Sequence, residues 1–91
     1  MKLGQVVMTR EINAAVANNE DFSMFVTESM FRYCRQDWGD LCASDKRMND
    51  SAVKNNDDRI VAHYNNNAHG DIYIITEWDR SATTILFTHE Y

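Results

Sequence analysis

The densest cluster of ionisable and aromatic side chains in this chain is Glu77-Trp78-Asp79-Arg80-Ser81. It lies between two apolar, β-branched runs that are expected to pair as strands. The carboxylates of Glu77 and Asp79 offer acid–base or cation-binding chemistry. Trp78 and Arg80 belong to the residue types most enriched at interface hot spots. Because charges destabilise a fold unless they pair or face water, this cluster is the first candidate for a functional site.

Further carboxylate pairs occur at Asp37 with Asp40 and at Asp57 with Asp58. Such pairs in turns most often form the turns themselves, by accepting hydrogen bonds from nearby amides. No residue spacing indicates a nucleophile with its base, and the histidines are scattered at His63, His69 and His89. We therefore predict a protein that is not an enzyme and needs no metal or cofactor. A small enzyme built on Glu77, Asp79 and Arg80 is the weakest alternative.

Two roles remain open for the cations and the tryptophans. Arg80 or Arg59 can bridge to a carboxylate across neighbouring strands and fix the hairpin internally. Alternatively, Arg80 and Trp78 anchor a partner protein. Trp38, which precedes Gly39 in a turn, is either a lid on the core, the commoner role, or a second anchor.

The charge balance limits the choice of partner. The chain of 91 residues carries 9 basic and 14 acidic side chains, a net charge of 9 − 14 = −5. This argues against direct binding of nucleic acid, which needs a basic face. An acidic surface either serves solubility alone, the commoner role, or is attracted to basic grooves on other proteins. The predicted partner-binding surface comprises Asp37, Trp38, Asp40, Asp57, Asp58, Glu77, Trp78, Asp79 and Arg80.

Hydrophobic patterning predicts one α+β domain over residues 1–91. A short first strand and two or three helices precede a three-stranded antiparallel meander, with the helices packed on one face of the sheet. The predicted strands are Leu3–Met8, Arg59–Tyr64, Asp71–Trp78 and Thr83–Phe87, and the helices are Arg10–Ala17, Glu20–Gln36 and a third from Ser44 or Asp45 to Lys54. The middle strand of the meander is expected at the centre of the sheet, because its apolar centre is almost continuous. The first strand is a candidate addition to the sheet edge.

Caps and cysteines complete the expectations. Thr9 is expected to cap the first helix, and Ser44 or Asp45 the third. The spacing of Cys34 and Cys42 fits no zinc site, so we predict two buried, reduced thiols in a cytosolic protein. No apolar run approaches the roughly 20 residues that span a membrane, and we expect no membrane association.

Several segments together resemble a family of small proteins carried by plasmids, integrative elements and phages, chiefly in Firmicutes. The segments are Asp37-Trp38-Gly39-Asp40, Asn49-Asp50-Ser51-Ala52, Arg59–Tyr64, Ile75–Leu86 and Glu90-Tyr91. The resemblance covers nearly the whole chain. Trp78 departs from it, since the family often has a small residue there. The family has no assigned activity, so the resemblance implies a setting, a mobile element inside a bacterial host, rather than catalytic residues.

In that setting the sequence is expected to encode an inhibitor of a bacterial defence system. An anti-CRISPR protein is the favoured form, acting in the bacterial cytoplasm as a monomer or homodimer. Its partner would be a CRISPR effector with a basic nucleic-acid groove, which an acidic domain can occupy in place of DNA. The alternative is a regulatory or accessory protein of the mobile element, similar to an antitoxin.

Overall fold

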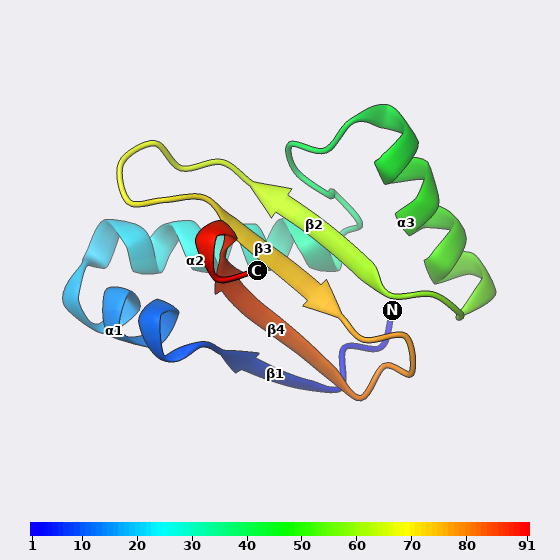
Figure 1. Cartoon of the computed structure of the whole chain (residues 1–91), viewed down its shortest axis with the longest axis horizontal. Coiled ribbons are helices and arrows are strands. Elements are labelled where there is room, and N and C mark those ends of the chain that lie inside the picture. Colours follow the sequence, from blue (N-terminus) through cyan, green and yellow to red (C-terminus); the bar gives the residue numbers. More distant parts are fainter.

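The computed structural model describes residues 1–91, and its elements run as one strand, three helices and three strands (Figure 1). The α+β class is confirmed. The strands are β1 (Gln5–Met8), β2 (Ile60–Tyr64), β3 (Ile72–Thr76) and β4 (Ala82–Phe87), and the helices are α1 (Arg10–Asn18), α2 (Glu20–Cys34) and α3 (Ala43–Asn55), followed by a 3₁₀ turn at Thr88–Glu90.

The helix boundaries follow from caps and backbone conformation. The hydroxyl of Thr9 accepts the amide of Ile12 at 3.2 Å, which confirms the predicted cap of α1. α2 ends two residues before its predicted end, where Gln36 takes a left-handed φ of 62°. The predicted cap of α3 at Ser44 or Asp45 is wrong, because the helix starts after Cys42 without a side-chain cap.

The sheet has the strand order β1-β4-β3-β2. β2, β3 and β4 pair antiparallel, and β3 lies between its neighbours as predicted. β1 pairs parallel to β4, with Gln5 opposite Ala82. The sheet is therefore four-stranded and mixed, rather than only a three-stranded antiparallel meander. Parallel pairing requires a long crossover, and the three helices and the meander between β1 and β4 provide it.

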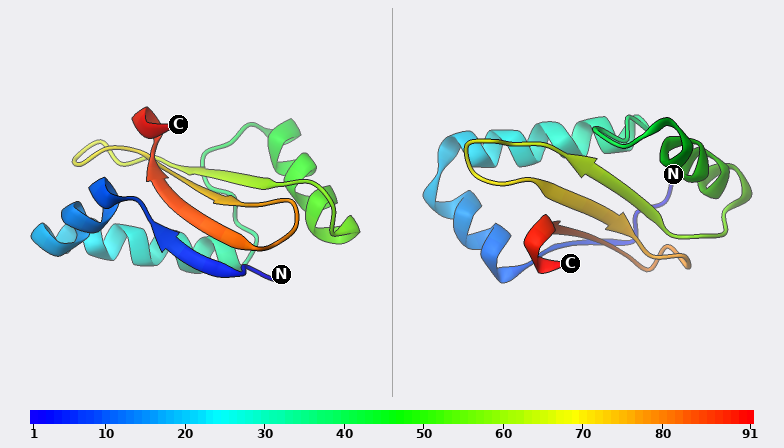
Figure 2. Two further views of the ribbon diagram at one scale, coloured as in Figure 1. Left: turned by 60° about the horizontal axis from the view of Figure 1, so that its bottom comes forward. Right: turned by 45° about the horizontal axis from the view of Figure 1, so that its top comes forward.

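α1 and α2 cover one face of the sheet, whereas α3 lies beside the β2 edge (Figures 1 and 2). The prediction that the helices pack on one face therefore holds for two of the three. Thirteen buried residues form the core: Ile12, Phe22, Val26, Tyr33, Trp38, Ala52, Ile60, Ala62, Tyr64, Ile72, Ile74, Ile85 and Phe87. The other face of the sheet carries no helix, and the 3₁₀ turn at the chain's end lies in front of it (Figure 1).

The core also holds a chain of hydroxyl groups under α2. The hydroxyl of Tyr33 lies 2.6 Å from that of Thr76, which lies 2.7 Å from that of Thr83. Thr83 in turn donates to the carbonyl oxygen of Leu3 at 2.7 Å. Burial raises the pKa of Tyr33 to about 12, so the phenol stays protonated. These bonds connect α2 to the sheet and to the segment before β1.

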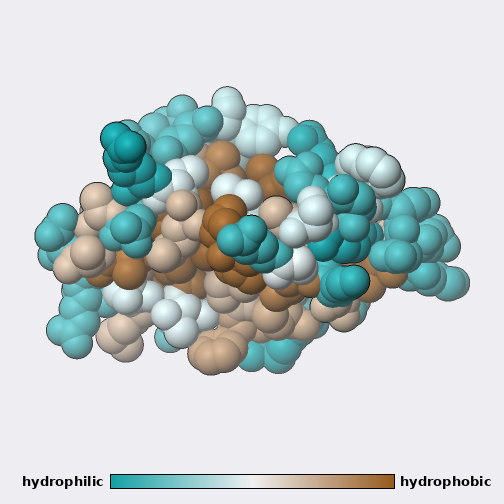
Figure 3. Space-filling view, turned by 90° about the horizontal axis from the view of Figure 1, so that it is seen from below, coloured by the Kyte–Doolittle hydropathy of each residue, from teal (hydrophilic) through white to brown (hydrophobic).

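The cysteine prediction is wrong in part, because Cys34 and Cys42 are free but exposed. Cys34 is the last residue of α2 and lies beyond the core-facing Tyr33. No helix of this structure is both long and apolar enough to cross a membrane. Seen from the β1 edge, apolar side chains gather across the middle of the molecule (Figure 3).

Candidate interaction surface

A tight turn joins β3 to β4 and contains most of the predicted site. The Arg80 amide donates to the carbonyl of Glu77 at 2.9 Å, and the Glu77 amide donates to Ala82 at 3.0 Å. Arg80 adopts a left-handed φ of 62°, a conformation that few non-glycine residues take. The carboxylate of Asp79 accepts the amide of Ser81 at 3.0 Å. The turn is thus fixed by local hydrogen bonds.

The Arg80 side chain turns inward and is only 5% exposed. Its Nη2 donates to the carbonyl of Ala52, near the end of α3, at 2.9 Å. Its Nη1 donates to four further backbone carbonyls, at 3.3, 2.8, 3.1 and 3.1 Å: those of Asp57, Asp58, Glu77 and Trp78. The guanidinium therefore connects α3, the α3–β2 loop and the β3–β4 turn.

These contacts overturn the expectation of an ion-pair network. The ion pairs of the structure are Arg32–Asp37, His63–Asp71 and His89–Glu11, and none contains Arg80 or Arg59. Backbone carbonyl oxygens, rather than carboxylates, surround the Arg80 guanidinium, and the one from Ala52 lies at the negative end of the α3 helix dipole. The planar fork of the guanidinium can bind several of them at once. Arg80 is therefore a structural residue and not an exposed anchor.

The Arg80 contacts bring together Asp57, Asp58, Glu77 and Trp78. With Asp79, which follows Trp78 in the same turn, these residues form what we call the acidic turn surface. The residue Trp78, in the β3–β4 turn, is 67% exposed. The side chains of Asp57 and Asp58 each accept the amide of the next residue, at 2.7 and 2.8 Å. Hydrogen bonds from Ser81 hold the pKa of Asp79 below its ordinary value. The surface thus combines one exposed indole with four exposed carboxylates that form no salt bridge.

Asp37 and Asp40 do not join the acidic turn surface, since they lie in the loop between α2 and α3. The Arg32 guanidinium donates to Asp37 at 2.8 and 3.2 Å, and this hydrogen bond holds the pKa of that carboxyl below its ordinary value. The carboxylate of Asp40 accepts the amide of Asn65 at 2.9 Å. Both carboxylates therefore hold the loop against neighbouring segments.

Trp38 is a core residue, 2% exposed, so it has the commoner of its two predicted roles, a lid on the core, and does not belong to the predicted partner-binding surface. Its ring packs edge-on against Tyr33, with centroids 5.4 Å apart. Its indole N–H donates to Asp50 on α3 at 2.8 Å. The indole acts as a lid between α2 and α3 because the turn at Gly39, which has a positive φ of 78°, directs the chain toward β2.

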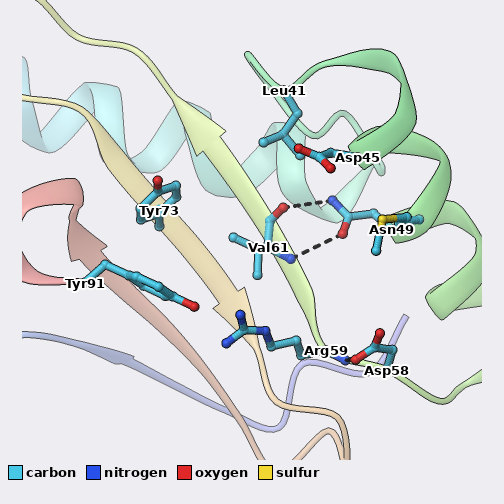
Figure 4. Close-up of a pocket in the computed structure, with 9 residues that line it drawn as sticks. Leu41, Asp45, Asn49, Asp58, Arg59, Val61, Tyr73 and Tyr91 are labelled. Carbon is cyan, nitrogen blue, oxygen red and sulfur yellow. Dashed lines mark hydrogen bonds between the residues drawn. The ribbon is translucent and has the colours of Figure 1, made fainter.

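A pocket of about 470 Å³ on the helix-free face of the sheet was not predicted (Figure 4). Tyr73 and Tyr91 line it in an edge-to-face contact, with centroids 5.4 Å apart. The guanidinium of Arg59 lies 5.7 Å from the centroid of the Tyr91 ring. Asp58 also lines the pocket, so it adjoins the acidic turn surface. The alternation of Arg59, Val61 and His63 along β2 is a signal that could have indicated this face. The pairing of β2 with β3, which places Tyr73 beside it, depends on contacts between distant segments.

The arrangement suits recognition by charge and shape. No three of the His, Cys, Asp and Glu side chains come close enough to hold a metal ion. Comparisons with protein families, with curated proteins and with solved structures found no match. The acidic turn surface and its supporting contacts are therefore the features of this chain that bear on its function.

Proposed function

We propose that this protein is a mobile-element-borne inhibitor of a bacterial defence system, in particular an anti-CRISPR protein of the bacterial cytoplasm. The observation that carries the proposal is the acidic turn surface, which combines the exposed Trp78 with exposed carboxylates that form no salt bridge. The partner that fits this surface is a protein with a basic groove for nucleic acid. CRISPR effectors hold DNA and RNA in such channels.

The mechanism is steric and electrostatic. Carboxylates on the acidic turn surface occupy the sites of DNA phosphates, and the net charge of −5 speeds encounter with a basic groove. Trp78 supplies the apolar anchor that charge alone lacks. Arg80 holds two loops in one arrangement, so little conformational freedom is lost on binding.

The first experiment measures phage or plasmid survival in a bacterium with an active, targeting CRISPR system, with and without this protein. Restored survival supports the proposal. Survival that stays low across several system types would overturn it and favour the antitoxin-like alternative, for which a pull-down of an element-encoded partner is the next step.

Matched variants test the surface once an effector is found. Trp78→Ala should weaken binding about 30-fold or more, the effect of losing a hot spot of about 2 kcal/mol. Phe31→Ala is its control, because Phe31 is also exposed, at 62%, but lies on α2. Glu77→Lys should weaken binding and reduce its salt dependence, whereas Glu28→Lys on α2 changes the net charge equally at a distant position. Equal effects of both members of either pair would contradict the proposed surface.

A further inference from the structure

β1 is an edge strand whose outer backbone groups face no other strand. The amides of Gln5 and Thr9 donate inward, to the carbonyls of Ser81 and Ile85, at 3.0 and 3.1 Å. Backbone groups of successive residues in a strand point to opposite sides. The N–H and C=O groups of Val6 and Met8 therefore point away from the sheet, where only water or another strand can pair with them.

The opposite edge of the sheet, β2, is closed by its own chain. The side-chain amide of Asn49 donates to the carbonyl of Val61 at 2.9 Å and accepts its amide at 3.3 Å (Figure 4). Two residues further along β2, the backbone amide of His63 donates to the carbonyl of Trp38 at 3.3 Å, and the carbonyl of His63 accepts the amide of Asp40 at 2.7 Å. Natural sheets cover edges in this way to prevent pairing with other chains. β1 has no such cover.

The side chains of β1 are suited to contact with another strand. Val6, Val7 and Met8 are 46%, 37% and 40% exposed, and apolar atoms cross the middle of this face (Figure 3). No charged residue occurs between Lys2 and Arg10. Charged residues, prolines and bulges are the usual protection of an exposed edge, so their absence here indicates an edge made for pairing.

We propose that β1 pairs antiparallel with β1 of a second copy, joining two four-stranded sheets into one continuous sheet about a two-fold axis. In this register Val7 lies opposite Val7 of the partner subunit, and Val6 opposite Met8 of the partner subunit. Each outward N–H and C=O then meets its complement, because the free groups of β1 are placed symmetrically about Val7. The inference does not depend on the proposed function.

The position of the acidic turn surface favours the antiparallel orientation of the second copy. Gln5 pairs with Ala82, directly after the β3–β4 turn, so the acidic turn surface lies at the N-terminal end of β1. Antiparallel pairing therefore places the two acidic turn surfaces at opposite ends of the joined sheet, whereas parallel pairing would bring these like charges together. The uncharged strand can approach its copy although each chain has a net charge of −5.

The interface is small, so we expect a reversible dimer. A four-residue strand with three exposed apolar side chains offers less than the roughly 800 Å² per partner that stable complexes bury. Sedimentation equilibrium between about 10 and 500 µM should show monomer–dimer exchange, the range expected for a Kd in the micromolar region. A monomer at every concentration would overturn the proposal.

Disulfide trapping tests the register in a background with Cys34→Ser and Cys42→Ser. Val7→Cys should form a disulfide-linked dimer on mild oxidation, since residues opposite each other in a non-hydrogen-bonded pair have Cα atoms about 4.5 Å apart. Val6→Cys alone should crosslink at least tenfold more slowly, because it lies opposite position 8 of the partner subunit. Equal rates for the two variants would show that this register is wrong.

A charge substitution tests the surface independently. Met8→Lys should raise the dimer Kd at least tenfold, because two ammonium groups would be brought against the pairing strands. Met48→Lys is the matched control, since Met48 is 63% exposed on α3. It should leave the Kd unchanged, and an equal effect of the two substitutions would place the contact elsewhere.

Discussion

Arg80 provides the sharpest test of how this fold is held together. Arg80→Ala removes a buried guanidinium that donates to the carbonyls of five residues in three segments: Ala52, Asp57, Asp58, Glu77 and Trp78. The carbonyls of Ala52 and Glu77 keep a backbone donor after the change, from Asp57 and Arg80 respectively. Those of Asp57, Asp58 and Trp78 keep none within the protein. Without the cation the two loops have no shared partner.

The expected loss is about 3–5 kcal/mol of the free energy of unfolding. Hydrogen bonds to a charged group contribute about 1.5–3 kcal/mol each, but they share one donor group here and the freed carbonyls can bind water, so the sum is much smaller than five separate bonds. A chain of 91 residues has a total stability of about 5–14 kcal/mol. At roughly 4–8 °C per kcal/mol, the melting temperature should fall by at least about 12 °C.

Thermal and urea unfolding followed by circular dichroism measure this loss. Arg80→Gly should be about 1 kcal/mol more stable than Arg80→Ala, because glycine adopts the φ of 62° without strain. Arg59→Ala is the control, since the exposed Arg59 guanidinium only stacks on Tyr91, and we expect a change of about 1 kcal/mol or less. A melting temperature for Arg80→Ala within about 3 °C of the unmodified protein would refute the structural role assigned to Arg80.

Three further perturbations test the edges and the α2–α3 loop. Asn49→Ala leaves the amide and carbonyl of Val61 unpaired and should lower the free energy of unfolding by about 2–3 kcal/mol in urea titrations, whereas Asn55→Ala should change it by less than about 0.5 kcal/mol. Gly39→Ala should unfold the protein or cost more than about 3 kcal/mol, because its added Cβ would collide with the His63 carbonyl at a φ of 78°; a mild effect in a thermal scan would contradict this. Asp37→Asn should cost about 0.5–1 kcal/mol at pH 7, since the pair with Arg32 is over a third exposed, and the cost should shrink as the pH falls below about 4. The lowered pKa of Asp37 makes its contribution complete above about pH 4 and lost as the pH falls below that, so a cost that does not vary with pH would exclude the ion pair as its source.

Local patterns in the sequence predicted most of the elements. The stripe of Phe22, Val26 and Tyr33 predicted the buried face of α2, and the apolar run Ile72–Ile75 predicted the central place of β3. Thr9 was found as a cap because capping depends on a residue type three positions before the amide it accepts. Such signals extend over a few residues, so the sequence alone carries them.

The candidate site was predicted by composition but not by role. The clustering of Trp78 and Asp79 in the sequence predicted that they belong to a functional site, and both lie on an exposed turn of the structure. The sequence did not show that Trp78 and Trp38 have different roles, because each lies next to an acidic residue in a predicted turn. Burial decides between an exposed indole and a core lid, and burial depends on which helix packs above the turn.

By itself the sequence determined the α+β class, the turn residues and the acidic charge, because each depends on residue type and short-range spacing. Only the tertiary structure decided that Arg80 binds carbonyls at the end of α3, 28 residues earlier in the chain. It also decided that β1 pairs with β4, and thus which edge of the sheet is left open. Both outcomes depend on contacts between segments that are far apart in the sequence. Residue type and short-range spacing do not indicate which of the possible contacts has the lowest free energy in the folded chain.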